Sequence, residues 1–320
     1  MDLSLRVIVV LVGVVLSGIV TANVSQAQPP IPFMFSKNEM VKYTSHYKGE
    51  RFENGRPKVS DDILERMKQV TMEEAWGVLN SHGYKNQYEG DWVKTHLNPV
   101  LVGRAVTCNF IPLRPDIRDF VEDEGHKNGY PGRDKHWVMD SLVKNDVIVA
   151  DLFGKKIGAG FIGDRLANMI YSKTGTGAVI DGGARDLAGV LELENFYVFN
   201  RNWEPSTSSS YETSMVIGMN VPIRIGRAAV MPGDVVLGLR EGVIFIPAHL
   251  ALEVVEESEI TRLTDEFGFI RLRDGVYNGG QIDAKWTDEI NEDFRKWWKS
   301  KENEITPSQR ELLRKQPWYK

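Results

Sequence analysis

The segment 146–186 restricts the fold of this chain more than any other stretch of its sequence. It contains a β-branched run at 147–150, a glycine-rich loop, a helix-like stretch that ends near Gly175, and a second β-branched run at 178–180. Strands that alternate with a helix in this way are typical of α/β domains. We therefore expect an α/β fold with this unit at its centre.

Patterns on either side extend the same domain. Further strand-like runs lie at 100–107, 222–225, 234–237 and 243–246. Helical patterns flank them at both ends, and one of these begins with the capping box expected between Thr71 and Glu74. Together they predict a single α/β domain over residues 59–269.

The two ends of the chain differ from this domain. Residues 28–58 are polar and mixed, which predicts a surface extension with little regular structure. Residues 270–320 hold four tryptophans among dense mixed charges. That composition predicts an amphipathic helical tail that packs on its own domain or on a neighbouring subunit.

The first 27 residues have the features of a signal peptide. Arg6 precedes an apolar run of 14 residues, and Ser25 and Ala27 supply the small side chains that a signal peptidase requires. The apolar run is shorter than the roughly 20 residues needed to cross a bilayer. We expect export to the periplasm or the medium and no membrane attachment after cleavage near Gln28. An uncleaved membrane anchor is the alternative.

Charge and cysteine content exclude some classes of function. The sequence has 39 Lys and Arg against 44 Asp and Glu, a net charge of -5, which disfavours a nucleic-acid partner because no broad positive field would attract phosphates. Its single cysteine, Cys108, excludes an intrachain disulfide and a cysteine-based zinc site. Because Cys108 lies in a strand-like run, we expect it to be a core residue and not a nucleophile.

The glycine-rich loop allows a dinucleotide-binding interpretation. Gly158, Gly160 and Gly163 match the spacing GxGxxG, and Asp181 follows some 18 residues later, as in dinucleotide-binding oxidoreductases. In dinucleotide-binding proteins this motif follows its strand directly, whereas here seven residues separate the strand that ends at 150 from the first glycine of the motif. Asp164 would also place negative charge where a pyrophosphate must bind.

A second interpretation assigns Asp164, Arg185 and Asp186 to a site for a metal ion and a 2-oxo acid. Mg²⁺ and Mn²⁺ prefer oxygen ligands, and a hard divalent ion needs only one or two carboxylates because it keeps several waters. Arg185 suits a substrate carboxylate through two parallel hydrogen bonds. Further donors would be the backbone amides of Gly160, Phe161, Ile162 and Gly163.

A purely structural explanation is also open. Asp164 would then cap a helix, and the turn at 181–186 would hydrogen-bond only to itself. The close glycines, the acid at the helix start and the Arg-Asp pair lie in one strand-loop-helix-strand-turn unit, and this combination favours function.

The sequence resembles the RraA-like family, which includes the class II 4-hydroxy-4-methyl-2-oxoglutarate aldolases, over residues 59–257. The most specific element is an Asp, twenty residues, Arg-Asp, two residues and Gly, here Asp164, Arg185, Asp186 and Gly189. Further similar stretches are 163–167, 177–186, 232–236 and 242–247. The resemblance implies an α/β/β/α swivelling-domain sandwich, a homotrimer or hexamer, and active sites between subunits.

The resemblance also implies roles for single residues. Asp186 would bind the metal directly, Asp164 would bind it through water, and Arg185 would hold the substrate carboxylate. An acid from the neighbouring subunit would complete the site, and its candidates are Glu253, Glu256 and Glu257.

Two departures from the family pattern affect this interpretation. Leu239 stands where many relatives have a second Asp. Residues 114–136 have the character of an insertion near the rim of the site, with Arg114, Arg118, His126, Arg133 and His136. The insertion would alter substrate choice, and we do not expect its histidines to be metal ligands.

The sequence thus predicts a metal-dependent carbon–carbon lyase that cleaves a 4-hydroxy-2-oxo acid to pyruvate and also decarboxylates oxaloacetate, since both reactions pass through the pyruvate enolate. The first alternative is a non-catalytic binding protein, because name-giving members of the family inhibit a ribonuclease. The dinucleotide-binding oxidoreductase is the second alternative.

Overall fold

The computed structural model describes residues 31–158, 160–205, 210–301 and 305–316. The predicted signal peptide at 1–27 lies outside these residues. No helix within the described part of the chain has both the length and the apolar character needed to span a membrane.

Ten strands form one mixed sheet, and two more pair separately. The strands are β1 (Tyr88–Glu89), β2 (Val93–Lys94), β3 (Leu101–Pro112), β4 (Asp146–Lys155), β5 (Ala178–Ala184), β6 (Val198–Asn200), β7 (Asn202–Trp203), β8 (Ser214–Met219), β9 (Ile223–Ile225), β10 (Ala228–Val230), β11 (Val235–Gly238) and β12 (Val243–Ile246). The main path through the sheet is β1-β12-β11-β3-β4-β5-β6-β2, with β7 beside β5 and β8 beside β3, while β9 and β10 form a hairpin.

Helices connect the strands and continue beyond the sheet. They are α1 (Lys37–Tyr43), α2 (Asp61–Met67), α3 (Met72–Ser81), α4 (Pro115–Lys127), α5 (Asp134–Asp140), α6 (Asp164–Thr174), α7 (Leu187–Leu191), α8 (Ser210–Thr213), α9 (Ala251–Arg273), α10 (Gly279–Ile282), α11 (Asp288–Ser300) and α12 (Pro307–Lys315), with a 3-10 turn, η1 (Ala248–Leu250), before α9.

The centre of the sheet is parallel. Strand β3 pairs with β4, β4 with β5, and β5 with both β6 and β7, all in the parallel sense. The segment 146–186 therefore folds as a β–α–β unit, with α6 between β4 and β5. Because the carboxyl ends of parallel strands lie at one edge of a sheet, ligands of α/β proteins bind there.

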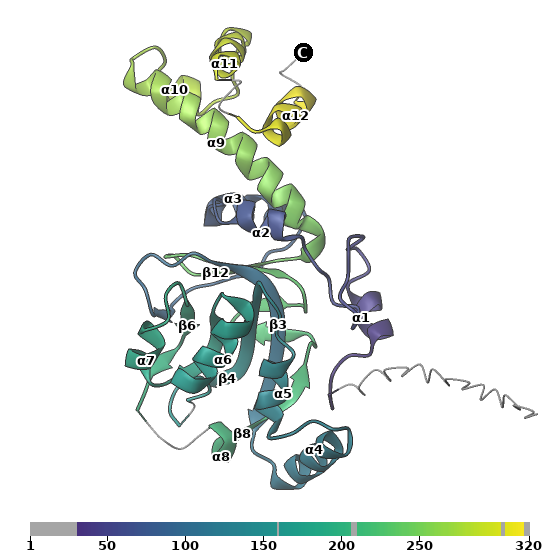
Figure 1. Cartoon of the computed structure of the whole chain (residues 1–320). Helices are drawn as coiled ribbons and strands as arrows, with labels where there is room; N and C mark the ends of the chain where they lie inside the picture. The colour runs from purple at the N-terminus through teal and green to yellow at the C-terminus, as the bar shows by residue number, and fades with distance from the viewer. Residues whose placement is uncertain (1–30, 159, 206–209, 302–304, 317–320) are drawn as a thin grey trace, which may run out of the picture.

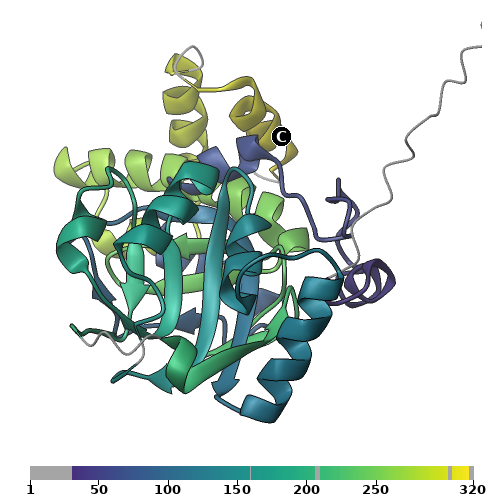
Figure 2. The ribbon, with the colours of Figure 1, turned by 60° about the horizontal axis from the view of Figure 1, so that its bottom comes forward.

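Three apolar clusters give the layers of the fold. One cluster joins α4–α7 to one face of the parallel strands. A second cluster fills the space between the parallel strands and β9–β12. A third joins α2, α3 and the start of α9 to β11 and β12. This order confirms the predicted α/β/β/α sandwich, and Figures 1 and 2 show its curled sheet with helices on both sides.

Local sequence signals explain several helix boundaries. The hydroxyl of Thr71 accepts a hydrogen bond from the N–H of Glu74, and the Glu74 carboxylate accepts one from the N–H of Thr71, so the predicted capping box is present at α3. Helix α6 ends at Thr174 and is capped by Gly175, whose φ of 66° is the left-handed conformation that glycine adopts readily. Cys108 is fully buried in β3, as expected.

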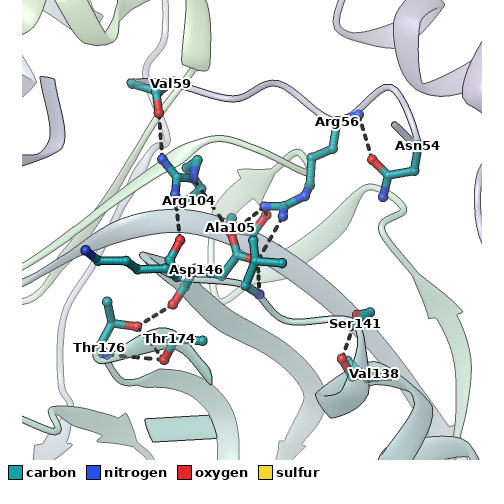
Figure 3. Close-up of polar contacts among 12 residues, drawn as sticks. Asn54, Arg56, Val59, Arg104, Ala105, Val138, Ser141, Asp146, Thr174 and Thr176 are labelled. Atoms are coloured by element: carbon teal, nitrogen blue, oxygen red, sulfur yellow. Dashed lines mark hydrogen bonds and ion pairs between the residues drawn. The ribbon is translucent and has the colours of Figure 1, made fainter. Parts of the chain in front are cut away.

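The extension at 28–58 is more ordered than predicted over its described part. It forms α1, whose first turn is fixed by a capping box between Ser36 and Glu39. It is also tied to the core by Arg56, which donates two hydrogen bonds to the Asp146 carboxylate at 2.9 and 2.8 Å. The side chains of Arg56 and Asp146 are almost completely buried. Nε of Arg104 lies 3.8 Å from Oδ1 of Asp146 (Figure 3).

The predicted helical tail is continuous with α9. This helix runs across the expected boundary at residue 269 and ends at Arg273, and its second half packs against α10–α12. Figure 1 shows α9 extending away from the sheet, with α10 next to its far end and α11 and α12 beside its outer part. A separate apolar cluster holds these helices together, so the tail packs mainly on α9 and not on the sheet.

Candidate active site

The three residues singled out in the sequence lie at the carboxyl ends of β4 and β5. Asp164 is the first residue of α6, the helix that follows the glycine-rich loop after β4. Arg185 and Asp186 follow β5 directly and precede α7. The parallel pairing of β4 and β5 brings the two loops together, although 20 residues separate Asp164 from Arg185 in the sequence.

Glycines allow the side chains to approach the backbone closely. A Cβ placed on Gly163 would lie 2.4 Å from Oδ2 of Asp186, and one on Gly160 would lie 2.8 Å from Cδ of Arg185. A Cβ on Gly189 would lie 2.8 Å from Cβ of Asp164. These contacts pack the Asp186 carboxylate against the start of α6 and the Asp164 side chain against α7.

Asp186 adopts a backbone conformation that is rare for residues other than glycine. Its φ is 59° and its ψ is 39°, in the left-handed region, where a side chain costs about 1 kcal/mol or more. The Nε of Arg185 lies 3.6 Å from Asp186 Oδ2, and the two side chains are 32% and 36% exposed. Both groups therefore remain accessible to a ligand.

The cleft around these residues has a volume of about 540 Å³. Its lining residues are Asp164, Arg185, Asp186, Leu187, Ala188, Gly189, Trp203, Glu204 and Pro205. Sequence reasoning missed Trp203, Glu204 and Pro205, because the two-residue strand β7 has no detectable periodicity. The indole N–H of Trp203 is buried and has no hydrogen-bond partner in the described structure.

The predicted backbone donors at 160–163 are only partly available. The N–H of Phe161 donates to the carbonyl of Gly183, so the prediction that this amide binds substrate is wrong. The loop runs beside β5 here, and the side chains of Phe161 and Ile162 are buried in the core. The amides of Ile162 and Gly163 have no backbone partner among the described residues and remain candidate donors.

The carboxylate oxygens that face the cleft are suitable ligands for a hard divalent cation. Two carboxylates, Asp164 and Asp186, face one open cleft, and such ions take one or two protein carboxylates and keep several waters. Over the described ranges, no group of three or more histidine, cysteine, aspartate or glutamate side chains is placed to hold a metal. An ion in this cleft would therefore need water or a neighbouring subunit to complete its coordination.

The dinucleotide-binding interpretation does not fit the position of Asp181. This residue is buried in β5, where its carboxylate accepts hydrogen bonds from Nε of Arg201 at 2.7 Å and from the N–H of Gly226 at 3.1 Å. It is therefore unavailable to a ribose hydroxyl. Strand β4 also runs to Lys155, further than the sequence pattern indicated.

The other singled-out residues lie around or away from the cleft. Residues 114–136 form α4 and the start of α5, and the imidazoles of His126 and His136 bond to backbone groups of Gly132 and Arg133. Glu253, Glu256 and Glu257 lie on α9, in the helix layer opposite α6 and α7. No acid of α9 lines the cleft within the described part of the chain.

Comparisons with known proteins agree with this architecture. The family model for RraA-like proteins, described as Aldolase/RraA, matches residues 57–245. A protein of Halalkalibacterium halodurans, provisionally named 4-hydroxy-4-methyl-2-oxoglutarate aldolase, is 31% identical over 131 residues, which is 41% of this chain and 60% of that protein. The chain thus spans about three-fifths of the length of this curated relative.

Solved structures share the fold. Streptomyces coelicolor RraAS2, described as an unusual member of the RNase ES inhibitor RraA protein family, has a TM-score of 0.57 at 24% identity, covering 68% of this chain and 98% of that one. An uncharacterized protein from Pseudomonas syringae pv. tomato str. DC3000 has a TM-score of 0.56 at 21% identity, covering 72% and 95%.

Proposed function

The chain belongs to the RraA-like family, and from this premise we propose that it is a divalent-metal-dependent carbon–carbon lyase. Its substrate would be a 4-hydroxy-2-oxo acid, cleaved to pyruvate and a second carbonyl compound. The observation that carries this proposal is the convergence of Asp164, Arg185 and Asp186 on one accessible cleft. A purely structural role would not require an open cleft beside a guanidinium and two carboxylates.

Arg185 would hold the carboxylate of the 2-oxo acid. Its planar guanidinium stays charged at any physiological pH and matches a carboxylate with two parallel hydrogen bonds. The amides of Ile162 and Gly163 are further candidate donors near this position. Such fixed donors stabilise charge that develops on the substrate, each by about 3 kcal/mol in comparable sites.

Asp186 and Asp164 are the residues that we propose to hold Mg²⁺ or Mn²⁺. When bound, the cation supplies Lewis-acid stabilisation of the negative charge that develops on the 2-oxo group. Asp186 is fixed for this task by its contact with Gly163, and Asp164 by its contact with Gly189.

The exposed carboxylate of Asp164 would also move a proton. In retro-aldol cleavage the 4-hydroxyl group loses its proton as the C3–C4 bond breaks, and C3 of the resulting pyruvate enolate gains one. Asp164 can accept the first proton, directly or through a water, and return it. Oxaloacetate decarboxylation needs only the second transfer, because loss of CO₂ leaves the same enolate.

Pyruvate release tests the proposal. Purified protein would be assayed with 4-hydroxy-2-oxoglutarate and oxaloacetate, with Mg²⁺ or Mn²⁺ and after chelation, and compared with Asp186→Ala and with Asp116→Ala, an exposed acid of α4. We expect metal-dependent turnover that Asp186→Ala removes and Asp116→Ala leaves intact. Absence of turnover with both ions, or full turnover in Asp186→Ala, would refute the lyase and favour a non-catalytic binding protein.

Two further proposals concern where and how the protein works. We propose that residues 1–27 direct export, and that the active protein is a homotrimer or hexamer in which an acid from a neighbouring subunit completes each site. A reporter fused to residues 1–27 that stays in the cytoplasm would contradict the first proposal. A monomeric mass in solution would contradict the second.

A further inference from the structure

A second cavity, the extension cavity, lies between the N-terminal extension and the α/β domain. It has a volume of about 280 Å³ and shares no lining residue with the cleft of the candidate active site. Part of its wall is the turn after α1, which includes Tyr47, and the rest includes Tyr84, Gln87, Asp234 and His249. The turn after α1 precedes residues 57–245, so this part of the wall lies outside the family model.

Asp234 places a buried carboxyl group in the cavity wall. It is 4% exposed, and its Oδ2 accepts a hydrogen bond from the N–H of Met231 at 2.8 Å. The N–H of Ala248 also donates to this carboxyl group, and no positively charged side chain opposes the rise of its pKa on burial. A carboxylate can accept about four hydrogen bonds. Asp234 therefore has acceptor capacity left, and its charge has no cationic partner.

Gln87 places a second acceptor in the same wall. Its side-chain nitrogen donates to the carbonyls of Ala229 at 3.1 Å and Phe245 at 2.9 Å, which fixes the orientation of the amide. The residue is 7% exposed, and its Oε1 has no hydrogen-bond partner in the described part of the chain. Because the nitrogen is bound to the sheet, Oε1 is the atom left for the cavity. A buried acceptor without a partner is unfavourable until a donor reaches it.

The charges around the extension cavity do not suit an anion. No lysine or arginine is among the described residues that line it. Burial lowers the pKa of His249, and the neighbouring His46 and His82 lower it further, while Glu253 opposes them. The imidazole of His249 is therefore mainly neutral at pH 7 and above and supplies no positive charge.

Tyr84 is the aromatic ring that remains open to a ligand. The rings of Tyr43 and Tyr47 already have cations beside them, because Nζ of Lys42 and Cζ of Arg51 each lie 5.5 Å from the ring centre. The Tyr84 ring contacts only the imidazole of His249 among the described aromatic pairs, at 6.3 Å between centroids. Its hydroxyl has no hydrogen-bond partner within the described ranges.

We propose that the extension cavity binds a small organic ammonium ion that carries N–H donors. The ammonium group would donate to Oε1 of Gln87 and to the Asp234 carboxylate, and the ring of Tyr84 would attract its positive charge. A volume of about 280 Å³ is at the lower limit for ligand pockets, so the ligand has only a few heavy atoms. This inference does not depend on the lyase proposal.

Three small molecules test the proposed recognition. Ligand-observed NMR titrations at pH 8 and constant ionic strength would compare the ammonium ion of 2-aminoethanol with choline, which has the charge but no N–H, and with ethylene glycol, which is neutral. We expect a Kd of about 1 mM for 2-aminoethanol. The other two should bind at least about tenfold more weakly. Equal affinity for either of them, or no binding of 2-aminoethanol up to about 100 mM, would refute the proposal.

Variants identify the site. Asp234→Asn keeps the shape but removes the charge, and it should weaken 2-aminoethanol at least about tenfold. Asp116→Asn, which removes the same charge from an exposed position in α4, should leave the Kd unchanged. Equal weakening by the two variants would show a general field and contradict the site.

Tyr84 gives a second test that does not require a change at a buried position. Tyr84→Leu removes the ring and should weaken binding about 3- to 30-fold, whereas Tyr84→Phe keeps the ring and should stay within about twofold of wild type. Wild-type affinity in Tyr84→Leu, or an equal loss in both variants, would refute the role of the ring. This pair decides the question if Asp234→Asn does not fold.

The extension supplies a further readout, because it forms part of the cavity wall. At about ten times its Kd, 2-aminoethanol should slow proteolysis between residues 31 and 58 about tenfold, since opening of this segment destroys the site. The same concentration of choline should have a much smaller effect. Unchanged cleavage in the presence of bound 2-aminoethanol would show that the ligand binds elsewhere.

Discussion

Gly163 has no room for a side chain, because a Cβ there would lie 2.4 Å from Oδ2 of Asp186. We predict that Gly163→Ala displaces this carboxylate and lowers metal-dependent pyruvate release at least about 100-fold, since small misplacements of catalytic groups have effects of that size. The measurement is kcat/KM at saturating Mg²⁺ together with the apparent affinity for the ion, which should also fall.

Gly77→Ala is the control for this glycine substitution. Gly77 lies in α3 with no heavy atom within 4 Å of a Cβ placed on it. Alanine should therefore stabilise the helix by about 0.5–1 kcal/mol and leave turnover unchanged. Full activity in Gly163→Ala would show that the position of the Asp186 carboxylate is not critical.

Asp234 should make stability depend on pH. It is buried directly before β11, and burial raises its pKa to about 7 although the N–H groups of Met231 and Ala248 donate to it. The folded protein then keeps this proton up to about pH 7, whereas the unfolded chain releases it near pH 4. The free energy of unfolding should therefore fall as the pH rises through this range, by at most about 4 kcal/mol.

Urea unfolding at pH 4.5 and 7.5 measures this effect. Other groups also titrate in this range, so the informative quantity is the difference between wild type and Asp234→Asn at each pH. That difference should shift in favour of the variant at the higher pH, whatever its absolute stability. An equal difference at both pH values would mean that Asp234 is ionised normally in the folded protein.

Among the structural elements, the segment that contains α1 depends on one buried ion pair. Arg56 and Asp146 are 4% and 0% exposed, and Figure 3 shows how Arg56 reaches Asp146 from the loop after α1. We predict that Arg56→Met lowers the free energy of unfolding by about 3 kcal/mol, because it leaves a buried carboxylate with only part of its partners. Proteolysis between residues 31 and 58 should also become faster.

Lys58→Met provides the comparison. Lys58 pairs with Glu50 at 2.7 Å, but the two side chains are 38% and 69% exposed. Its loss should cost less than about 1 kcal/mol, as for other surface pairs. Equal effects of the two substitutions in urea unfolding would argue against a special role of the buried pair.

Secondary structure was predictable where local signals are strong. The capping box of α3, the glycine after α6 and the β-branched runs of β3, β4 and β5 all lie where the sequence indicated. Helices α4 and α5 were not predicted, because α4 is mostly polar and α5 has only two turns. The order of α1 depends on Arg56 and Asp146, which are far apart in the sequence, so no local pattern reveals it.

At the scale of the whole molecule, the layers and part of the site were predictable. Asp164, Arg185 and Asp186 share a β–α–β unit, so parallel pairing alone brings them to one cleft. Trp203 reaches the same cleft through β7, and this placement depends on tertiary packing. The roles of Asp164, Arg185 and Asp186 in binding remain predictions.

The C-terminal helices have an apolar cluster of their own, separate from the three clusters that pack on the sheet, and this separation gives a last prediction. Phe294 of α11 is fully buried, with its ring 5.3 Å from that of Phe267 and 5.4 Å from that of Trp286. These rings belong to the cluster on the second half of α9, which does not include the sheet. Phe294→Ala should therefore destabilise the C-terminal helices by about 3–5 kcal/mol.

Amide hydrogen exchange distinguishes local from global loss in this variant. Exchange in α11 and α12 should become faster, while β3, β4 and β5 keep wild-type protection, because cooperative units with separate cores open separately. Metal-dependent turnover should also persist, since the cleft lies at the carboxyl ends of these strands. Phe269→Ala, on the same helix as Phe267 but 57% exposed, should change neither quantity. Faster exchange in β3–β5 of Phe294→Ala would instead show that α9 couples this cluster and those on the sheet into one cooperative unit.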